Sequence, residues 1–438
     1  MKSIIKALLF MLTTVILCYC EKEPPFVLIP DYNFYFALIG SGIDTNNDSI
    51  ISYAEAAAVT YLNVIARDIS DLTGIDKFIN IETLLCSNNQ LITVDLSSNT
   101  ALITLDLREN SLTSLDISNN TALERLYCNH NQLRSLDVSS NTSLVELTCT
   151  ANRLKNLDVS ANVALEKLVC EENKLETLDV SDCTALEILD CYHNQLNTLD
   201  VTNNTALIFL DCNVNRLTSL DISNNNALED LCCINNEITT LDVSNCIALK
   251  YLVCGNTLTT LDVSNNLALV RLCCFGQLTS LDVTNNIALE RLYCGGNQLT
   301  SLDVSSNTIL EELGCDNNQL TFLDVTKNLA LKGLYCGMNQ LTSLDVSNNT
   351  DLKHLYCDLN LLKTLDVSYN TVLIGLFCSS NQLTRLDISK NSKLDWLWID
   401  NMPTLHEVCV WTLPFPPSGF HLKVNGSPNV YFTMDCSK

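Results

Sequence analysis

The stretch that decides the fold is Leu123–Ser143, LERLYCNHNQLRSLDVSSNTS, which is followed directly by a second copy, LVELTCTANRLKNLDVSANVA. The copies share a 21-residue period, and this pattern runs from about Ile81 to about Asn401. A unit of this size cannot bury its own apolar face, so neighbouring units must stack into one continuous core. The repeat therefore predicts an elongated domain and moves the search for function from a pocket to a long surface.

One cysteine marks the register of the repeat, and Leu107 and Ile399 take its place in two further units, which gives about 16 coils. Free cysteine packs as a small apolar residue, so we interpret the column as stacked thiols, although exported proteins with many cysteines commonly form disulfides. Outside this ladder, Cys409 and Cys436 are the expected disulfide pair. The ladder comprises Cys86, Cys128, Cys149, Cys170, Cys191, Cys212, Cys233, Cys254, Cys274, Cys294, Cys315, Cys336, Cys357 and Cys378.

Written in columns, the unit is LxxLxCxxNxLxxLDVSxNxA. The alternation within LxxLxC and LxxLDV predicts two extended stretches per coil, with leucine, cysteine and valine pointing inward. The asparagines are expected to bond peptide groups and to form ladders from coil to coil, with Cys183 and Cys246 occupying two of their slots. An aspartate column from Asp95 to Asp387 has Ser or Thr two residues later, which favours local capping over a ladder of divalent cations.

These columns resemble the leucine-rich repeat family, and the nested second LxxLDxSxN is similar to a short bacterial subclass of it. The segment Ile69–Ile75, ISDLTGI, is similar to the lead-in of internalin-like proteins. The resemblance covers about residues 67–401 and implies a leucine-rich-repeat solenoid, mainly β, with parallel β-sheet coils and little helix. It also implies adhesion or another protein–protein interaction at a surface.

The segments outside the repeat have their own predicted roles. Residues 1–20 read as a signal peptide, with Lys2 and Lys6 before an apolar run, and LCYC at 17–20 resembles a lipoprotein cleavage site with Cys20 lipidated. Tyr19 departs from that pattern, because a small residue is expected before the cysteine. We therefore expect a bacterial protein that is either a surface or outer-membrane lipoprotein or secreted, and that meets a membrane only through its anchor. Residues 21–66 are expected to form a tether and helical cap, and residues 402–438 a C-terminal cap.

The cap contains a candidate calcium site at residues 44–55, DTNNDSIISYAE, which matches the loop pattern of an EF-hand. Stretches compatible with helix flank it on both sides, and calcium there would be structural. The departure is Ser49, which stands where glycine normally makes the sharp turn and weakens the expected affinity. A polar loop that matches by chance is the alternative. The expected ligands are Asp44, Asn46, Asp48, the carbonyl of Ile50, Ser52 through water, and Glu55.

The residue before the ladder cysteine points outward, and in the last third of the repeat it becomes aromatic. Aromatic side chains supply large contact area at low entropic cost, which favours a binding surface for a protein ligand. Rings also stack on sugars, so a polysaccharide-binding surface protein is the alternative, and a passive envelope scaffold is a third. Tyrosine also simply suits half-exposed strands, which is the structural explanation. The candidate surface consists of Tyr293, Tyr335, Tyr356, Phe377, Trp396 and Trp398.

Charge and motif content exclude two other classes of function. The net charge of −25 and pI of about 4.4 exclude a partner held through a phosphate backbone, so no nucleic acid is expected. None of the five histidines falls in a metal-spaced cluster, and no nucleophile motif is present, so we predict no catalytic residues and no enzyme.

Overall fold

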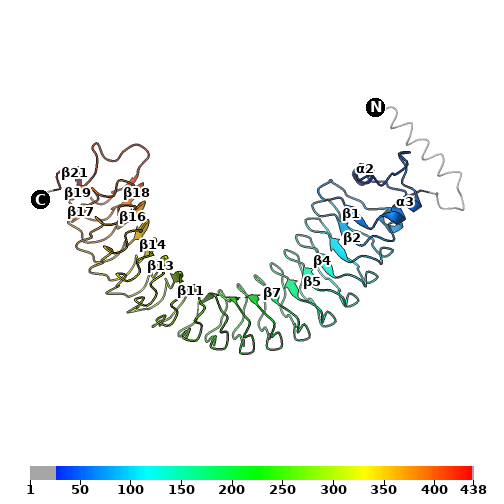
Figure 1. The fold of residues 1–438 in the computed structure, drawn as a ribbon, viewed down its shortest axis with the longest axis horizontal. Helices are drawn as coiled ribbons and strands as arrows, with labels where there is room; N and C mark the ends of the chain where they lie inside the picture. The colour runs from blue at the N-terminus through cyan, green and yellow to red at the C-terminus, as the bar shows by residue number, and fades with distance from the viewer. Residues whose placement is uncertain (1–25, 256, 437–438) are drawn as a thin grey trace. The chain divides into compact units, whose positions relative to one another are not determined.

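The computed structural model describes residues 26–436 apart from residue 256, and its contacts divide the chain into two units. Cys20 and the rest of the predicted signal lie outside the described residues. The first unit ends at Asn194 and the second begins at Gln195. Within each unit, the coils contribute one short strand each to the main ladder, and successive strands of the ladder pair in parallel (Figure 1). None of the described helices is long and apolar enough to cross a membrane.

The first unit begins with two short helices and continues as a parallel ladder in which each strand pairs with the next. The ladder starts at β1, just after the helical cap. The elements of this unit are α2 (Tyr32–Gly40), α3 (Tyr53–Ala58), β1 (Tyr61–Asn63), the 3-10 turn η1 (Ile75–Lys77), β2 (Thr83–Leu85), β3 (Thr104–Asp106), β4 (Arg125–Tyr127), β5 (Glu146–Thr148), β6 (Lys167–Val169) and β7 (Ile188–Asp190).

The second unit continues the same repeat, and its tail adds strands to two ladders. The main ladder runs from β8 to β16 and on through β18 to β20, while β17, β19 and β21 form a second sheet. The strands are β8 (Phe209–Asp211), β9 (Asp230–Cys232), β10 (Tyr251–Gly255), β11 (Arg271–Phe275), β12 (Arg291–Tyr293), β13 (Glu312–Gly314), β14 (Gly333–Tyr335), β15 (His354–Tyr356), β16 (Gly375–Phe377), β17 (Arg385–Asp387), β18 (Trp396–Trp398), β19 (Glu407–Cys409), β20 (His421–Lys423) and β21 (Tyr431–Thr433).

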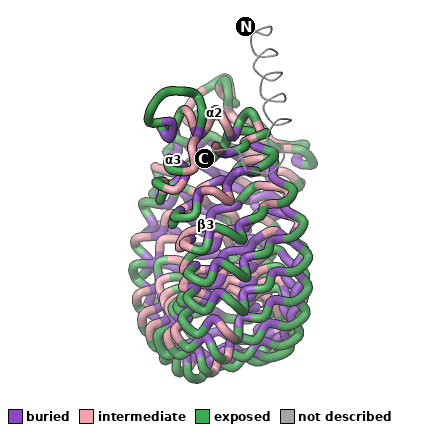
Figure 2. The backbone as a smooth tube through the Cα atoms, turned by 90° about the vertical axis from the view of Figure 1, so that its right-hand side faces the viewer, coloured by how far each residue is buried: buried purple, intermediate pink, exposed green. Residues whose placement is uncertain are grey.

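The parallel solenoid with little helix confirms the predicted fold class. Buried and exposed residues alternate around each coil (Figure 2), and the leucine, cysteine and valine columns point inward. The ladder cysteines are buried thiols that form no disulfide in the described part of the chain. Burial raises the pKa of Cys149 to about 12, so the thiols behave as neutral apolar side chains rather than as nucleophiles.

The second stretch of each coil differs from expectation, because only the last one, β17, forms a strand. Each of these stretches ends in a local cap. In the coil of Asp137, one carboxylate oxygen accepts hydrogen bonds from the backbone N–H of Ser139 at 2.9 Å and from its hydroxyl at 2.7 Å. The aspartate therefore turns the chain directly after the stretch. The bonds from Ser139 lower the pKa of Asp137. Asp387 in β17 accepts the same bond from the N–H of Ser389 at 2.9 Å, so the cap is compatible with a strand.

Asparagine amides fix each coil on the preceding one. The Asn141 side chain is fully buried and donates to the carbonyls of Ile117 at 3.0 Å and Asn120 at 2.8 Å. Cysteine replaces the equivalent asparagine in two coils, and in one of them the thiol of Cys183 lies 3.6 Å from both of the corresponding carbonyl oxygens. The amide oxygen of Asn141 accepts no hydrogen bond from a described residue. The slot therefore requires a donor and has no use for an acceptor.

We predict that Asn141→Asp destabilises the protein by about 3 kcal/mol, because it replaces the donor with an acceptor facing two carbonyl oxygens. Asn141→Cys retains a weak donor and should cost about 1 kcal/mol. Urea unfolding of both variants measures the difference. Equal losses would show that the slot selects for size rather than for a donor.

Candidate binding surface

The predicted aromatic residues gather on the outward face of the second unit. Tyr335, Tyr356, Phe377 and Trp398, here called the aromatic stripe, end the strands β14, β15, β16 and β18. The parallel register pairs each of them with the next across neighbouring strands. Because paired strands lie about 4.8 Å apart, these side chains meet ring to ring. The structure thus assembles four of the predicted surface residues into one continuous row.

The rings of the stripe stack on one another rather than lying open to solvent. Ring centroids are 4.9 Å apart between Tyr335 and Tyr356 and 4.0 Å between Tyr356 and Phe377, and Phe377 meets Trp398 edge-on at 4.6 Å. Phe377, which was expected to be exposed, is only 6% exposed because its neighbours cover both faces. The Lys423 ammonium lies 3.3 Å from the centroid of Trp398 and caps the row. The stripe therefore presents ring edges and hydroxyl groups.

The other two predicted residues stand apart from the stripe. Tyr293 is two coils away from Tyr335, with Gly314 at the same position of the coil between them. The Arg271 guanidinium lies 5.7 Å from the centroid of the Tyr293 ring. Trp396 occupies the first position of β18 and is 38% exposed. Its ring stacks on His421 at 3.7 Å with an interplanar angle of 5°.

Glycines make room for the rings, and the sequence reasoning did not identify them. A Cβ atom on Gly375 would lie 2.8 Å from a ring carbon of Phe377 and 3.2 Å from Nδ1 of His354. A Cβ atom on Gly333 would lie 3.1 Å from the ring of Tyr335, and one on Gly314 would lie 2.8 Å from the ring of Tyr293. Rings and glycines on the same outward face are thus packed as one surface.

A row of carboxylates runs beside the stripe, at the position after the ladder cysteine. Asp316, Asp358 and Asp400 occupy this position on alternate coils, and the sequence reasoning missed them because it read only the column before the cysteine. Two hollows open between the stripe and this row. The first has a volume of about 420 Å³ and is lined by Tyr293, Gly314, Asp316, Tyr335, Gly337, Met338, Tyr356 and Asp358.

Desolvation raises the pKa of both Asp316 and Asp358, and the neighbouring carboxylates Asp316 and Asp400 raise that of Asp358 further. Burial, together with the Glu312 carboxylate, raises the pKa of Tyr335 to about 12. The Tyr335 hydroxyl is therefore protonated at neutral pH, and its hydrogen-bond partner is the Glu312 carboxylate.

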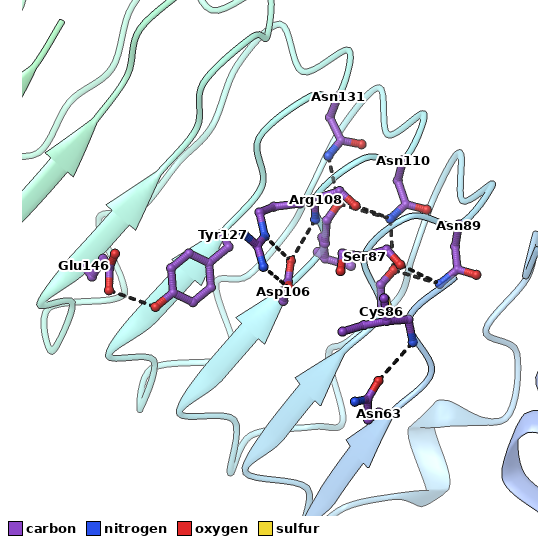
Figure 3. Close-up of polar contacts among 12 residues, drawn as sticks. Asn63, Cys86, Ser87, Asn89, Asp106, Arg108, Asn110, Tyr127, Asn131 and Glu146 are labelled. Atoms are coloured by element: carbon purple, nitrogen blue, oxygen red, sulfur yellow. Dashed lines mark hydrogen bonds and ion pairs between the residues drawn. The ribbon is translucent and has the colours of Figure 1, made fainter. Parts of the chain in front are cut away.

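Some outward side chains of the first unit pair with one another, as Figure 3 shows. Asp106 is 2% exposed and receives the Arg108 guanidinium through two side-chain bonds of 2.9 and 2.7 Å. Tyr127 donates its hydroxyl to Glu146 at 2.8 Å. The Asp106 carboxylate is thus paired within the described part of the chain, unlike the carboxylates beside the stripe.

The candidate calcium loop lies between α2 and α3, with Ser49 at φ +63°, the left-handed turn that the sequence required of it. Asp44 accepts from the backbone N–H of Ser49 at 2.9 Å and from that of Asp48 at 3.2 Å. Asn46 accepts from the N–H of Asp48 at 2.8 Å. The loop is thus folded around its first ligand position, as an oxygen-donor site requires.

The Glu55 carboxylate is held by the ends of the loop. It accepts from the backbone N–H and hydroxyl of Thr45, both at 2.8 Å, and from those of Ser52 at 2.9 and 2.8 Å. Ser52 in turn caps α3. These bonds, those of Ser52 first, lower the pKa of Glu55 to about 2. The carboxylates of Asp44, Asp48 and Glu55 do not all lie within 4.8 Å of one another in the described structure.

In the tail, Cys409 and Cys436 are joined by a disulfide. A carboxylate oxygen of Asp387 lies within 4.8 Å of both sulfur atoms. These three residues are the one group of three possible metal ligands among the described residues. The disulfide occupies both sulfurs, so this cluster is structural. It ties the end of the chain to β19.

The fold defines a leucine-rich-repeat solenoid of the short-coil type. The functional domain of InlJ from Listeria monocytogenes, described as including a cysteine ladder, is 34% identical, with 83% of each chain covered and a TM-score of 0.75. The chain belongs to the bacterial internalin-like leucine-rich-repeat proteins, as its sequence predicted. No protein-family model and no curated protein matches it.

Two more distant structures share the fold. The leucine-rich-repeat protein LIC12759 of Leptospira interrogans is 24% identical, with 75% of this chain and 92% of that one covered and a TM-score of 0.68. The ectodomain of the receptor kinase GASSHO1/SCHENGEN3 of Arabidopsis thaliana, described in complex with CASPARIAN STRIP INTEGRITY FACTOR 2, is 20% identical, with 83% and 54% covered and a TM-score of 0.59.

We predict that Gly375→Ala displaces the Phe377 ring from its stack on Tyr356, because the new methyl group overlaps that ring. Overpacking of this kind costs about 1–3 kcal/mol. The near-ultraviolet circular dichroism signal and the melting temperature should both fall. Gly40→Ala is the control, since a Cβ atom there meets nothing within 4 Å. An unchanged aromatic signal in Gly375→Ala would contradict the packing described for the stripe.

Proposed function

We propose that this chain is a non-enzymatic binding protein that holds a protein ligand on the strand face of its second unit. The observation that carries the proposal is the aromatic stripe with the two hollows beside it. Aromatic groups in partly desolvated hollows supply much of the energy at protein interfaces. Membership of the internalin-like family supports the same conclusion, and one protein of the same fold is described with a bound partner.

The stacking of the rings favours a protein over a polysaccharide. A sugar binds aromatic residues by lying on an open ring face, but Tyr356 and Phe377 stack face to face at 4.0 Å and Trp398 meets Phe377 edge-on at 4.6 Å. Trp396, the most exposed of the candidate rings, is stacked on His421. Ring edges and hydroxyl groups remain outward, and these suit the mixed apolar and hydrogen-bonding surface of a protein.

The proposed location is the bacterial cell surface, either as a lipoprotein anchored through Cys20 or as a secreted protein. Lys2, Lys6 and the apolar run that follows support export. The internalin-like family supports the same compartment. A surface location would place the stripe where it can meet partners outside the cell.

The test compares the whole protein with Tyr335→Ser/Tyr356→Ser/Trp398→Ser, leaving the buried Phe377 in place. Loss of about 2 kcal/mol or more of binding energy is expected, because these side chains form the centre of the surface. Binding is measured by interferometry against a panel of purified cell-surface and matrix proteins, alongside a glycan array.

Tyr251→Ser/Tyr369→Ser is the control, since these tyrosines are 41% and 59% exposed away from the stripe. It should bind as the wild type does. If the stripe variant also binds its panel protein at full strength, the proposal is wrong. If the wild type binds only glycans and the stripe variant does not bind them, the surface recognises a polysaccharide. If the wild type binds neither proteins nor glycans, the chain is a passive scaffold.

We also propose that the 44–55 loop binds calcium and thereby stabilises the N-terminal cap. The donor set fits, since Asp44, Asn46, Asp48 and Glu55 offer hard oxygens between two helices and Ser49 takes up the turn. Ile50 would add its carbonyl and Ser52 a bound water. Glu55 is ionised throughout the ordinary pH range, since its pKa is about 2.

For calcium, we expect the melting temperature of chelator-treated protein to rise when calcium is added. A ligand at 100 times its Kd adds about 2.7 kcal/mol of stability. Asp44→Asn/Glu55→Gln should abolish the rise, whereas Glu82→Gln, an exposed carboxylate of the same unit, should preserve it. Calorimetric titration gives the stoichiometry. A melting temperature indifferent to calcium in the wild type would show that the loop resembles an EF-hand by chance.

A further inference from the structure

The carboxylate row of the second unit has a period of two coils. Asp316, Asp358 and Asp400 follow β13, β15 and β18, whereas Gly337 and Ser379 follow the strands between them. Consecutive strands in this ladder are paired in register from β13 to β18. Since strands lie about 4.8 Å apart, the carboxylates recur at about 9.6 Å.

These carboxylates have no cationic partner of their own. None of the three forms an ion pair with a described residue, in contrast to Asp106 and Arg108 in the first unit. The Asp358 carboxylate lies over Gly337, where a Cβ atom would be 2.9 Å from its Oδ1. The Ser379 hydroxyl donates a hydrogen bond to Asp400, but this donor carries no positive charge. The row is therefore a line of negative charge that a ligand can neutralise.

The two hollows join this row to the aromatic stripe. The first contains Asp316, Gly337 and Asp358 opposite Tyr335 and Tyr356. The second contains Asp358, Ser379 and Asp400 opposite Phe377 and Trp398. Lys423, which also lines the second hollow, already places a cation on the Trp398 ring. Each hollow thus combines a carboxylate at either end with an aromatic wall, a combination that suits the alkyl stem and charged head of a basic side chain.

The spacing decides between kinds of cation. A divalent ion binds its oxygens at 2.3–2.6 Å and cannot bridge carboxylates two coils apart. A peptide in the polyproline II conformation has three residues per turn and rises about 3.1 Å per residue, so every third side chain points the same way at about 9.3 Å. That repeat matches the carboxylate row.

We propose that the groove between the stripe and the carboxylate row binds an extended segment of the protein ligand that carries Arg or Lys at every third position. The segment runs along the stack of coils, with its basic groups at Asp316, Asp358 and Asp400. This inference rests on the proposed function and specifies the chemistry of its partner.

The test uses two end-capped peptides of equal composition and charge, Arg-Pro-Pro-Arg-Pro-Pro-Arg and Arg-Arg-Arg-Pro-Pro-Pro-Pro, titrated calorimetrically into the full chain. The spaced peptide should bind about ten-fold more tightly than the clustered one, since only it places an Arg at each carboxylate. Asp316→Asn/Asp358→Asn should abolish this preference. Glu290→Gln/Asp351→Asn is the matched control, because it removes two exposed carboxylates of the same unit outside the groove.

Equal affinity of the two peptides, or no binding of either, would overturn the inference. The inference would also fail if the control variant lost as much affinity for the spaced peptide as the Asp316→Asn/Asp358→Asn variant does. Diffuse attraction to a chain of net charge −25 would then explain the binding. Thermal melting verifies that both variants fold. Suppose that a panel protein no longer binds the stripe variant but binds the Asp316→Asn/Asp358→Asn variant as strongly as the wild type. That result would overturn this inference while leaving the proposed function intact.

Discussion

The structure depends on the amide groups that bond each coil to the one before it. A coil of this length buries nothing alone. Its turn carbonyls each accept one backbone N–H of their own coil, as Ile117 does from Asn120 at 3.0 Å. Asn141 and its equivalents add a second hydrogen bond to two such carbonyls at once, which fixes the rotation of one coil on the next. Where Cys183 replaces the asparagine, its thiol lies 3.6 Å from each of the corresponding pair of oxygens and keeps a weak donor in the slot.

This constraint leaves few positions free to carry function. Leucine, cysteine, valine and asparagine columns are inward and committed to the core, and the aspartate column is committed to the turn. Only the outward positions of the short strands vary without disturbing the stack. Beside the rings of the second unit, some of these positions are glycines, such as Gly333 and Gly375, and they leave the space into which the rings fold.

The sequence predicted the parts of the fold that follow from periodicity. The register, the inward columns, the flanking helices and the outward aromatic column can be read from spacing, because a fixed period places the same slot in the same environment on every coil. Contacts between side chains on neighbouring coils could not be read in this way. The burial of Phe377 follows from the strand spacing and from Gly375 beside it. Asp358 and its equivalents were overlooked because their significance lies in what stands across the hollow.

The carboxylate row is easier to explain as a recognition device than as a structural one. A structural aspartate in this protein accepts local hydrogen bonds that lower its pKa, as Asp137 does with Ser139. Desolvation instead raises the pKa of Asp316 and Asp358, which means that folding disfavours their charged forms. Asparagine would fit the same space without that cost, so the charge contributes nothing to the stability of the free protein. A cation supplied by a ligand would reverse the direction of the pKa shift, because a nearby positive charge favours the ionised carboxylate and lowers the pKa of both Asp316 and Asp358.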